Sequence, residues 1–156
     1  MDVSTCIWFH GRIEEAAQWY VSLVPGSSVG EITRYPDPNP FPSGEPGEAL
    51  TVEFTLGGTP YMLLHGGPEF PLTEAVSIVV VVEGQGEVDR LWDALVADGG
   101  QESVCGWCKD RFGLSWQVVP RRYLELAAGP SAAAVNEAMM QMRKLDVAAL
   151  EAAATA

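Results

Sequence analysis

The feature that most constrains the fold is a repeat, because the second half of the chain opens as the first half does. In each half an apolar, strand-like segment ends at a glycine and leads into an amphipathic helix. Gly11 corresponds to Gly84 and Trp19 to Trp92, and both pairs are 73 residues apart. Three further strand-like segments follow each helix. The sequence therefore predicts an α+β fold of two tandem βαβββ modules.

The repeat and the composition between its copies divide the chain into three parts. We predict a first module over 1–70, a second module over 71–120 and a helical tail over 121–156, all within one compact domain. Within the first module, residues 36–47 contain five prolines and two glycines. Proline lacks the backbone N–H that a helix or a strand ladder needs, so this stretch is predicted to be a loop.

The tail carries three helix signals. Gly129-Pro130 closes a short helix, Ser131 stands where the N-cap of a longer helix to about Leu145 is expected, and Asp146 precedes a final short helix. Alanine-rich helices bury little area by themselves, so we expect these to pack on the sheet or on a second subunit.

The charge balance limits the classes of partner. The chain has 21 Asp and Glu against 9 Lys and Arg, a formal net charge of −12. Nucleic acids and anionic lipids are bound through clustered basic groups, so neither a nucleic-acid nor a membrane partner is expected. The longest apolar run, Val76 to Val82, is far shorter than the about 20 residues of a membrane span. With no signal peptide at its start and three cysteines, an odd number, the sequence indicates a cytoplasmic protein.

Several segments resemble one family. They are Trp8-Phe9-His10-Gly11, Gly66-Gly67-Pro68-Glu69-Phe70, and the tryptophan-rich block from Cys105 to Pro120. On these residues the chain resembles the PhnB-like branch of the vicinal oxygen chelate superfamily, often labelled 3-demethylubiquinone-9 3-methyltransferase-like, from about Ser4 to Leu150. The resemblance implies the glyoxalase/bleomycin-resistance/dioxygenase fold, a half-open cleft and a homodimer.

The resemblance also implies where a metal ion would be held. In the metal-dependent relatives, four strands each supply a carboxylate or an imidazole to a divalent ion. The matching positions in this chain are Thr5, Leu64 or His65, Ser77 and Gln117. Neutral Thr, Ser and Gln are weak ligands, so we expect no bound metal and no other cofactor. If these positions are misplaced by one or two residues, a metal-dependent lyase, isomerase or dioxygenase is the alternative.

The methyltransferase label is not supported by the sequence pattern. A methyl-donor enzyme of the doubly wound class needs a glycine-rich turn in a parallel sheet that alternates with helices. The segment Glu83-Gly84-Gln85-Gly86 offers such a turn, but no alternating pattern follows it. We therefore do not expect methyl transfer.

Cys105-Gly106-Trp107-Cys108 has the spacing of a dithiol redox or zinc motif. A reactive dithiol is stabilised at a helix N-terminus, whereas the residues after Cys108 are typical of a hairpin turn. The sequence favours a structural role and leaves a redox or zinc role open.

Strand alternation predicts a ligand cleft. Ser115 and Gln117 share one face of their strand, while Trp116 lies on the other and packs under a helix. If Gln117 occupies the position that holds a metal ligand in the metal-dependent relatives, its face of the strand lines the cleft. The same alternation then turns Thr5, Ile7 and Phe9 toward the cleft. The cleft is then mostly apolar and suited to a small planar organic ligand. Its predicted lining is Phe9, Glu53, Ser77, Trp107, Ser115 and Gln117.

His65 closes a strand immediately before Gly66-Gly67-Pro68, a loop that the resemblance places beside the cleft. Imidazole exchanges protons near neutral pH, so His65 is the catalytic candidate, with Gln117 and Ser77 orienting the substrate. A binding module would use the same cleft through stacking and burial alone. The sequence leaves both an enzyme and a binding module open.

Overall fold

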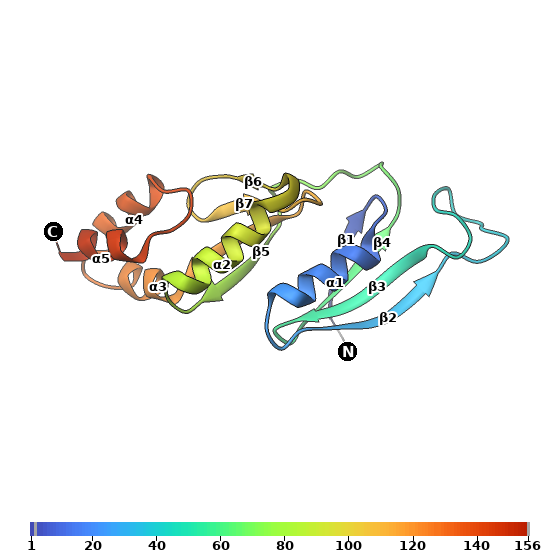
Figure 1. The fold of residues 1–156 in the computed structure, drawn as a ribbon, viewed down its shortest axis with the longest axis horizontal. Helices are drawn as coiled ribbons and strands as arrows, with labels where there is room; N and C mark the ends of the chain where they lie inside the picture. Colours follow the sequence, from blue (N-terminus) through green and yellow to red (C-terminus); the bar gives the residue numbers. More distant parts are fainter. Residues whose placement is uncertain (2, 156) are drawn as a thin grey trace. The chain divides into compact units, whose positions relative to one another are not determined.

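The computed structural model describes residue 1 and residues 3–155. It divides into two compact units, Met1–Leu72 and Thr73–Ala156. Each unit contains one four-stranded sheet, and each has the strand–helix–three-strand order that the repeat predicts (Figure 1). The predicted α+β fold of two tandem modules is therefore confirmed. None of the helices in the described part of the chain has the length and apolar character needed to cross a membrane.

The first unit is built from five elements in the predicted order. They are β1 (Thr5–Phe9), α1 (Ile13–Leu23), β2 (Ser28–Arg34), β3 (Ala49–Leu56) and β4 (Thr59–His65). The strand order in the sheet is β1-β4-β3-β2, with β1 parallel to β4 and the other neighbours antiparallel. A two-residue turn, Gly57-Gly58, joins β3 to β4.

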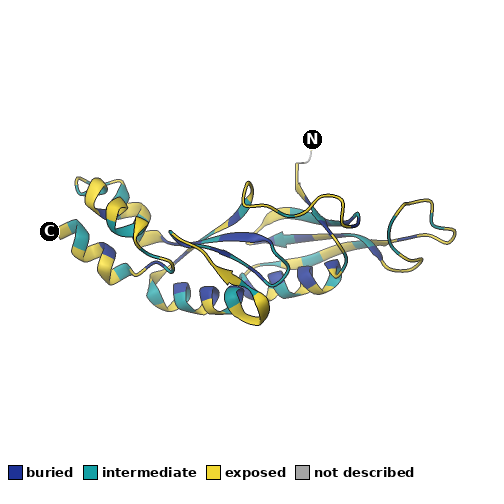
Figure 2. Ribbon diagram, turned by 90° about the horizontal axis from the view of Figure 1, so that it is seen from above, coloured by how far each residue is buried: buried dark blue, intermediate teal, exposed yellow. Residues whose placement is uncertain are grey.

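Helix α1 covers one face of this sheet because its apolar residues recur at helical spacing. Its buried positions are Ile13, Ala16, Ala17, Tyr20 and Leu23. Buried and exposed residues alternate along α1 and also along the helix of the second unit, as they do in amphipathic helices (Figure 2).

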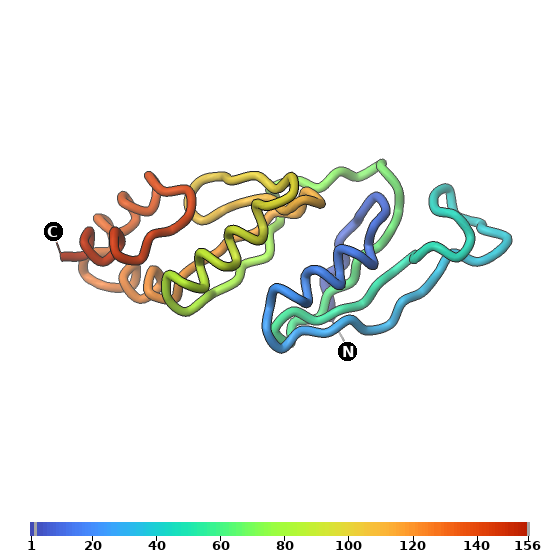
Figure 3. Tube along the Cα trace, in the orientation of Figure 1, coloured from blue at the N-terminus to red at the C-terminus, as the bar shows by residue number. Residues whose placement is uncertain are grey.

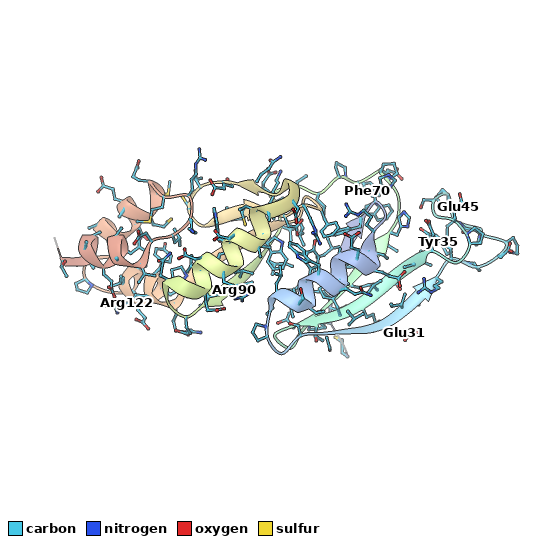
Figure 4. The ribbon with its side chains drawn as sticks, in the orientation of Figure 1. Glu31, Tyr35, Glu45, Phe70, Arg90 and Arg122 are labelled. Carbon is cyan, nitrogen blue, oxygen red and sulfur yellow. The ribbon has the colours of Figure 1, made fainter. Side chains whose placement is uncertain are left out.

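The proline-rich segment 36–47 is a loop that extends past the ends of β2 and β3 (Figure 3). Figure 4 labels Tyr35 where β2 enters this loop and Glu45 within it. Tyr35 is 3% exposed, and its ring lies 5.8 Å from that of Phe41 between centroids. A Cβ on Gly44 would lie 2.0 Å from the Tyr35 ring, so only glycine lets the loop close over this side chain.

The second unit repeats the topology with shorter strands. Its module consists of β5 (Ser77–Val82), α2 (Gly84–Val96), β6 (Gln101–Glu102), β7 (Trp107–Lys109) and β8 (Ser115–Pro120). The strand order is β5-β8-β7-β6, and β5 is parallel to β8. A short 3-10 helix over Ala97–Gly99 follows α2, whose buried residues are Val88, Leu91, Trp92 and Leu95.

Three helices complete the second unit. They are α3 (Arg121–Ala127), α4 (Ala132–Met140) and α5 (Val147–Thr155), and their core consists of Val135, Leu145 and Leu150. Figure 4 labels Arg122 on α3 and Arg90 on α2.

The predicted extent of the middle tail helix is wrong, since α4 ends at Met140 and not near Leu145. The carbonyls of Met142 and Arg143 accept hydrogen bonds from Cys105 N and Gly106 N, both at 2.7 Å. These two carbonyls bind the backbone of Cys105 and Gly106, and the helix does not continue past them. Helix propensity alone does not predict this end.

The two predicted caps of the tail differ in outcome. Ser131 makes no capping hydrogen bond, because its hydroxyl donates to the carbonyl of Ala154 at 2.7 Å. The cap at Asp146 is confirmed: Ala149 N donates to its Oδ1 at 2.9 Å.

Candidate functional site

The sheet of the second unit has one face packed against α2 and one face that we call the open face of unit 2. The strand registers place Ser77, Val79, Val81, Trp107, Lys109, Ser115, Gln117 and Val119 on this open face. Val79 is 53% exposed and Val81 37% exposed, whereas Ile78 and Val82 on the opposite side are buried. The apolar run from Val76 to Val82 therefore has only one buried face, and Val79 and Val81 lie on the other.

A neutral hydrogen-bonding pair lies among these apolar residues. Gln117 Nε2 donates to Ser77 Oγ at 2.9 Å. In the strand ladders, Gln117 lies beside Val79 on β5 and beside Trp107 on β7. The predicted residues Ser77, Trp107 and Gln117 thus share one face, as strand alternation indicates.

Ser115 lies on the same face but is covered. It is 1% exposed, and its hydroxyl has no hydrogen-bond partner among the residues that the structure describes. It lines a cavity of about 130 Å³ together with Trp107 and Lys109. The ammonium group of Lys109 pairs with Glu74 at 2.5 Å, and this hydrogen bond lowers the pKa of the Glu74 carboxyl. The basic group of this face is therefore already neutralised.

In the first unit, the predicted orientation of the β1 side chains is wrong. Phe9 is 4% exposed and Ile7 is 7% exposed, and both lie on the side of the sheet that α1 covers. The other side carries Cys6 and Trp8. The repeat itself holds the signal for this, since an offset of 73 residues aligns Trp8 with the exposed Val81, so Phe9 does not belong to an open face.

Glu53 lies on the open side of the first sheet, in the alternating strand β3. It is exposed and lines a hollow of about 580 Å³ with Ser28, Tyr61 and Met62 among others. Partial burial raises the pKa of the Tyr61 phenol.

His65 lies on the helix-covered side of the first sheet. It ends β4 beside Phe9 in the parallel ladder and is 9% exposed. Its side chain lines a pocket of about 270 Å³ at the first turn of α1. His10 is exposed, with its ring centroid 6.2 Å from that of His65. His65 therefore does not share a sheet face with Glu53, and the residues around Gln117 belong to the other unit.

The positions implied for a metal ion do not fit one. Ser77 and Gln117 are neutral and hydrogen-bonded to each other, and Leu64 supplies no ligand atom. His65 faces the opposite side of its sheet from Leu64, as neighbours in a strand do. Within residues 1 and 3–155, no group of three or more His, Cys, Asp or Glu side chains is arranged to hold a metal ion.

The two cysteines with dithiol spacing differ in environment. All three cysteines are free thiols. Burial, with smaller contributions from Asp110 and Glu102, raises the pKa of Cys108 to about 12. Cys108 lies within strand β7, where no helix N-terminus stabilises a thiolate, while the Cys105 thiol contacts Met140 Sδ at 3.6 Å. The environment of Cys108 favours a structural role.

Asp110, which was not among the predicted site residues, organises the turn between β7 and β8. Its buried carboxylate accepts hydrogen bonds from Phe112 N at 2.8 Å, Leu114 N at 3.1 Å and Trp116 Nε1 at 2.8 Å. An aspartate three residues before a glycine, here Gly113, is typical of such turns and could have indicated this role.

The architecture described above has known relatives. The family model described as 3-demethylubiquinone-9 3-methyltransferase matches residues 1–119. The chain belongs to this family. The match stops before α3, so the three tail helices lie outside the part that characterises the family.

Solved structures agree with this family assignment. The PhnB protein from Bacillus cereus is 29% identical, with a TM-score of 0.69, and the match covers 77% of this chain and 99% of that chain. Protein PA1353 from Pseudomonas aeruginosa is 22% identical, with a TM-score of 0.62 over 77% of this chain and 97% of that one, a likeness in fold alone. In a comparison with curated proteins, none matches.

Proposed function

We propose that this PhnB-like protein binds a small, planar, uncharged organic ligand on the open face of unit 2. The observation that carries the proposal is the Gln117–Ser77 pair, which lies beside the exposed Val79 and Val81. Ligand sites are mostly apolar and contain a few polar groups that fix the orientation of the ligand. The open face has this composition.

The polar pair keeps hydrogen-bonding capacity for a ligand. A glutamine amide has two N–H donors and a carbonyl acceptor, and the bond to Ser77 uses one of the donors. Trp107, the neighbour of Gln117 on β7, offers an aromatic surface for stacking. The ammonium group of Lys109 on this face is paired with Glu74, so it does not call for a charged ligand.

The proposal does not include methyl transfer, although the family description names that activity. Each sheet has a single parallel pair, and the glycine-rich turn at Gly84 begins a helix that leads to the antiparallel edge strand β6. A doubly wound dinucleotide or methyl-donor site needs consecutive parallel strands joined by helices.

The homodimer implied by the family resemblance belongs to the proposal as well and is tested by the mass of the protein in solution.

The test uses N-phenyl-1-naphthylamine, a neutral aromatic probe whose fluorescence rises on binding. Val79→Asp and Val81→Asp place a charge on the open face, and each is expected to weaken probe binding at least tenfold, which is about 1.4 kcal/mol. Val104→Asp is the matched control, because Val104 is 56% exposed outside the strands. Unchanged probe binding in both face variants overturns the proposal. So does a result in which the two substitutions change the oligomeric mass of the protein in solution and leave probe binding unaltered.

A further inference from the structure

We propose a second binding site in the first unit, where the start of α1 and His65 together hold the carboxylate group of a small organic acid. The site is the pocket of about 270 Å³ that is lined by residues 11–15 at the start of α1 and by Glu48, Ala49 and His65. It lies within Met1–Leu72 and does not depend on the ligand proposed for the open face of unit 2.

The backbone at the start of α1 presents uncommitted N–H groups. Gly11 has φ +73° and Arg12 has φ +54°, both left-handed, and helical residues begin at Ile13. Such a change of hand turns successive N–H groups toward one point and forms an anion-binding concavity at the positive end of the helix. Within the described residues, the N–H groups of Ile13 and Glu14 have no acceptor, and no side chain caps the helix.

His65 supplies the second, independent observation. Its imidazole is 9% exposed, and neither ring nitrogen has a hydrogen-bond partner in the described chain. A Cβ built on Gly11 would lie 3.9 Å from His65 Nε2, so this nitrogen points toward the turn that begins α1. The imidazole is thus largely buried, while its nitrogens are reached from the pocket, where a ligand can bind them.

The surroundings hold His65 in this orientation. The Tyr35 hydroxyl donates to the carbonyl of His65, and the Tyr35 ring stands edge-on to the imidazole with centroids 5.6 Å apart. Tyr35 itself is buried below the proline-rich loop. The ring is therefore fixed by packing while its nitrogens remain available.

The carboxylates around the pocket are largely engaged elsewhere. Glu14 forms a two-point ion pair with Arg34 at 2.8 and 3.1 Å, and Glu15 forms one with Arg12 at 2.7 and 2.9 Å. Glu48 Oε2 accepts a hydrogen bond from Glu45 N at 2.9 Å. The donors that still lack a partner are two amides and the imidazole, and a carboxylate can accept from all three.

The experiment records the amide spectrum of the ¹⁵N-labelled full chain while sodium acetate is added against sodium chloride at equal ionic strength. We expect saturable shifts of the Ile13 and Glu14 amides with acetate only. His65→Leu is expected to weaken acetate binding at least fivefold. His10→Leu is the matched control, because His10 is exposed and does not line the pocket.

Three outcomes overturn the proposal. One is the absence of saturable shifts at Ile13 and Glu14 in the wild-type chain, a result that does not depend on whether any variant folds. Another is an equal response to acetamide, which would show that the pocket recognises a carbonyl and not a carboxylate. The third is unchanged acetate affinity in a folded His65→Leu variant.

Discussion

The two modules share a topology but differ in the residues at the end of the fourth strand and at the start of the helix. In each, a left-handed glycine stands at the start of the helix, Gly11 just before α1 and Gly84 as the first residue of α2, and the first strand pairs in parallel with the fourth. Where the first module ends its fourth strand with His65 beside Phe9, the second ends with Pro120 beside Val82. The same fold position is thus a polar pocket in one copy and apolar chain in the other.

The starts of the two helices differ in the same way. In the second module, Gln85 directly follows Gly84, and it binds the tail: its Nε2 donates to the carbonyl of Leu145 at 3.1 Å and its Oε1 accepts from Val147 N at 2.8 Å. Arg12 occupies the corresponding place in the first module and binds Glu15 on its own helix. The chain's own tail therefore fills at α2 the kind of place that stays open at α1.

The sheets also differ in what secures them. Strands β2, β3 and β4 of the first module are 7, 8 and 7 residues long, whereas β6 and β7 of the second have 2 and 3 residues. Short strands make few ladder hydrogen bonds, so the second module relies more on side chains and on the tail. The comparison teaches that one topology can be stabilised by backbone pairing in one copy and by side-chain bonds in the other.

The largest effect is expected at Asp110, which carries much of this side-chain bonding. Asp110→Ala removes three hydrogen bonds to a carboxylate, two of them buried, including the one from the Trp116 indole N–H. We expect the second unit to lose about 3 kcal/mol, which lowers its Tm by roughly 12 to 24 °C. Thermal unfolding followed by near-ultraviolet circular dichroism measures this loss.

The matched control is Asp93→Ala on α2. Asp93 is an exposed carboxylate whose contact to Lys144 is 3.4 Å long, so its removal should change the stability by less than about 0.5 kcal/mol. If Asp110→Ala costs no more than this control, the second module does not depend on its turn carboxylate and the contrast with the first module fails.

Much of the fold could be predicted because the repeat, the helical spacing and the glycine turns are local signals. The two modules, the loop over 36–47 and the shared face of Ser77 and Gln117 follow from such patterns. The end of α4 at Met140 could not, because backbone bonds to Cys105 and Gly106 decide it, and these residues are distant in sequence.

The site was harder to predict than the fold. Parity along a single apolar strand is ambiguous, because both faces of β1 carry large apolar residues, and this placed Phe9 on the wrong side. The 73-residue offset resolves the ambiguity only when it is applied residue by residue. The pocket at His65 depends on backbone N–H groups at Ile13 and Glu14, which no side-chain motif encodes.

Two glycines, one in each module, compare how closely the chain is packed in the first module and in the second. A Cβ on Gly66 would lie 2.2 Å from the Trp8 ring, which donates from Nε1 to Gly67 O at 2.8 Å, whereas nothing lies within 4 Å of a Cβ on Gly86. We expect Gly66→Ala to destabilise the first unit by about 2 kcal/mol through overpacking. Gly86→Ala, in α2, should stabilise the second unit by about 0.5 kcal/mol.

Chemical denaturation of both variants measures these opposite signs. The fluorescence of Trp8 should also shift in Gly66→Ala, since the ring has to leave its edge-on contact with Phe70, where the centroids are 4.8 Å apart. If Gly66→Ala is no more destabilising than Gly86→Ala, the loop at Gly66 accommodates the added methyl group with no loss in the free energy of unfolding.

The smallest of the three predicted losses of stability is expected at Gln85, where the tail packs on the start of α2. Gln85→Ala removes the hydrogen bonds to Leu145 and Val147 from a part-buried position, so we expect a loss of about 1 kcal/mol from the second unit. The Val147 amide should then exchange with solvent about fivefold faster, because its acceptor is gone and the tail opens locally. Gln18→Ala, at an exposed position of α1, is the control and should leave this exchange unchanged. Unaltered protection of Val147 in Gln85→Ala would show that the apolar core around Leu145 and Leu150 holds the tail without the glutamine, and the two helix starts would then differ only in sequence.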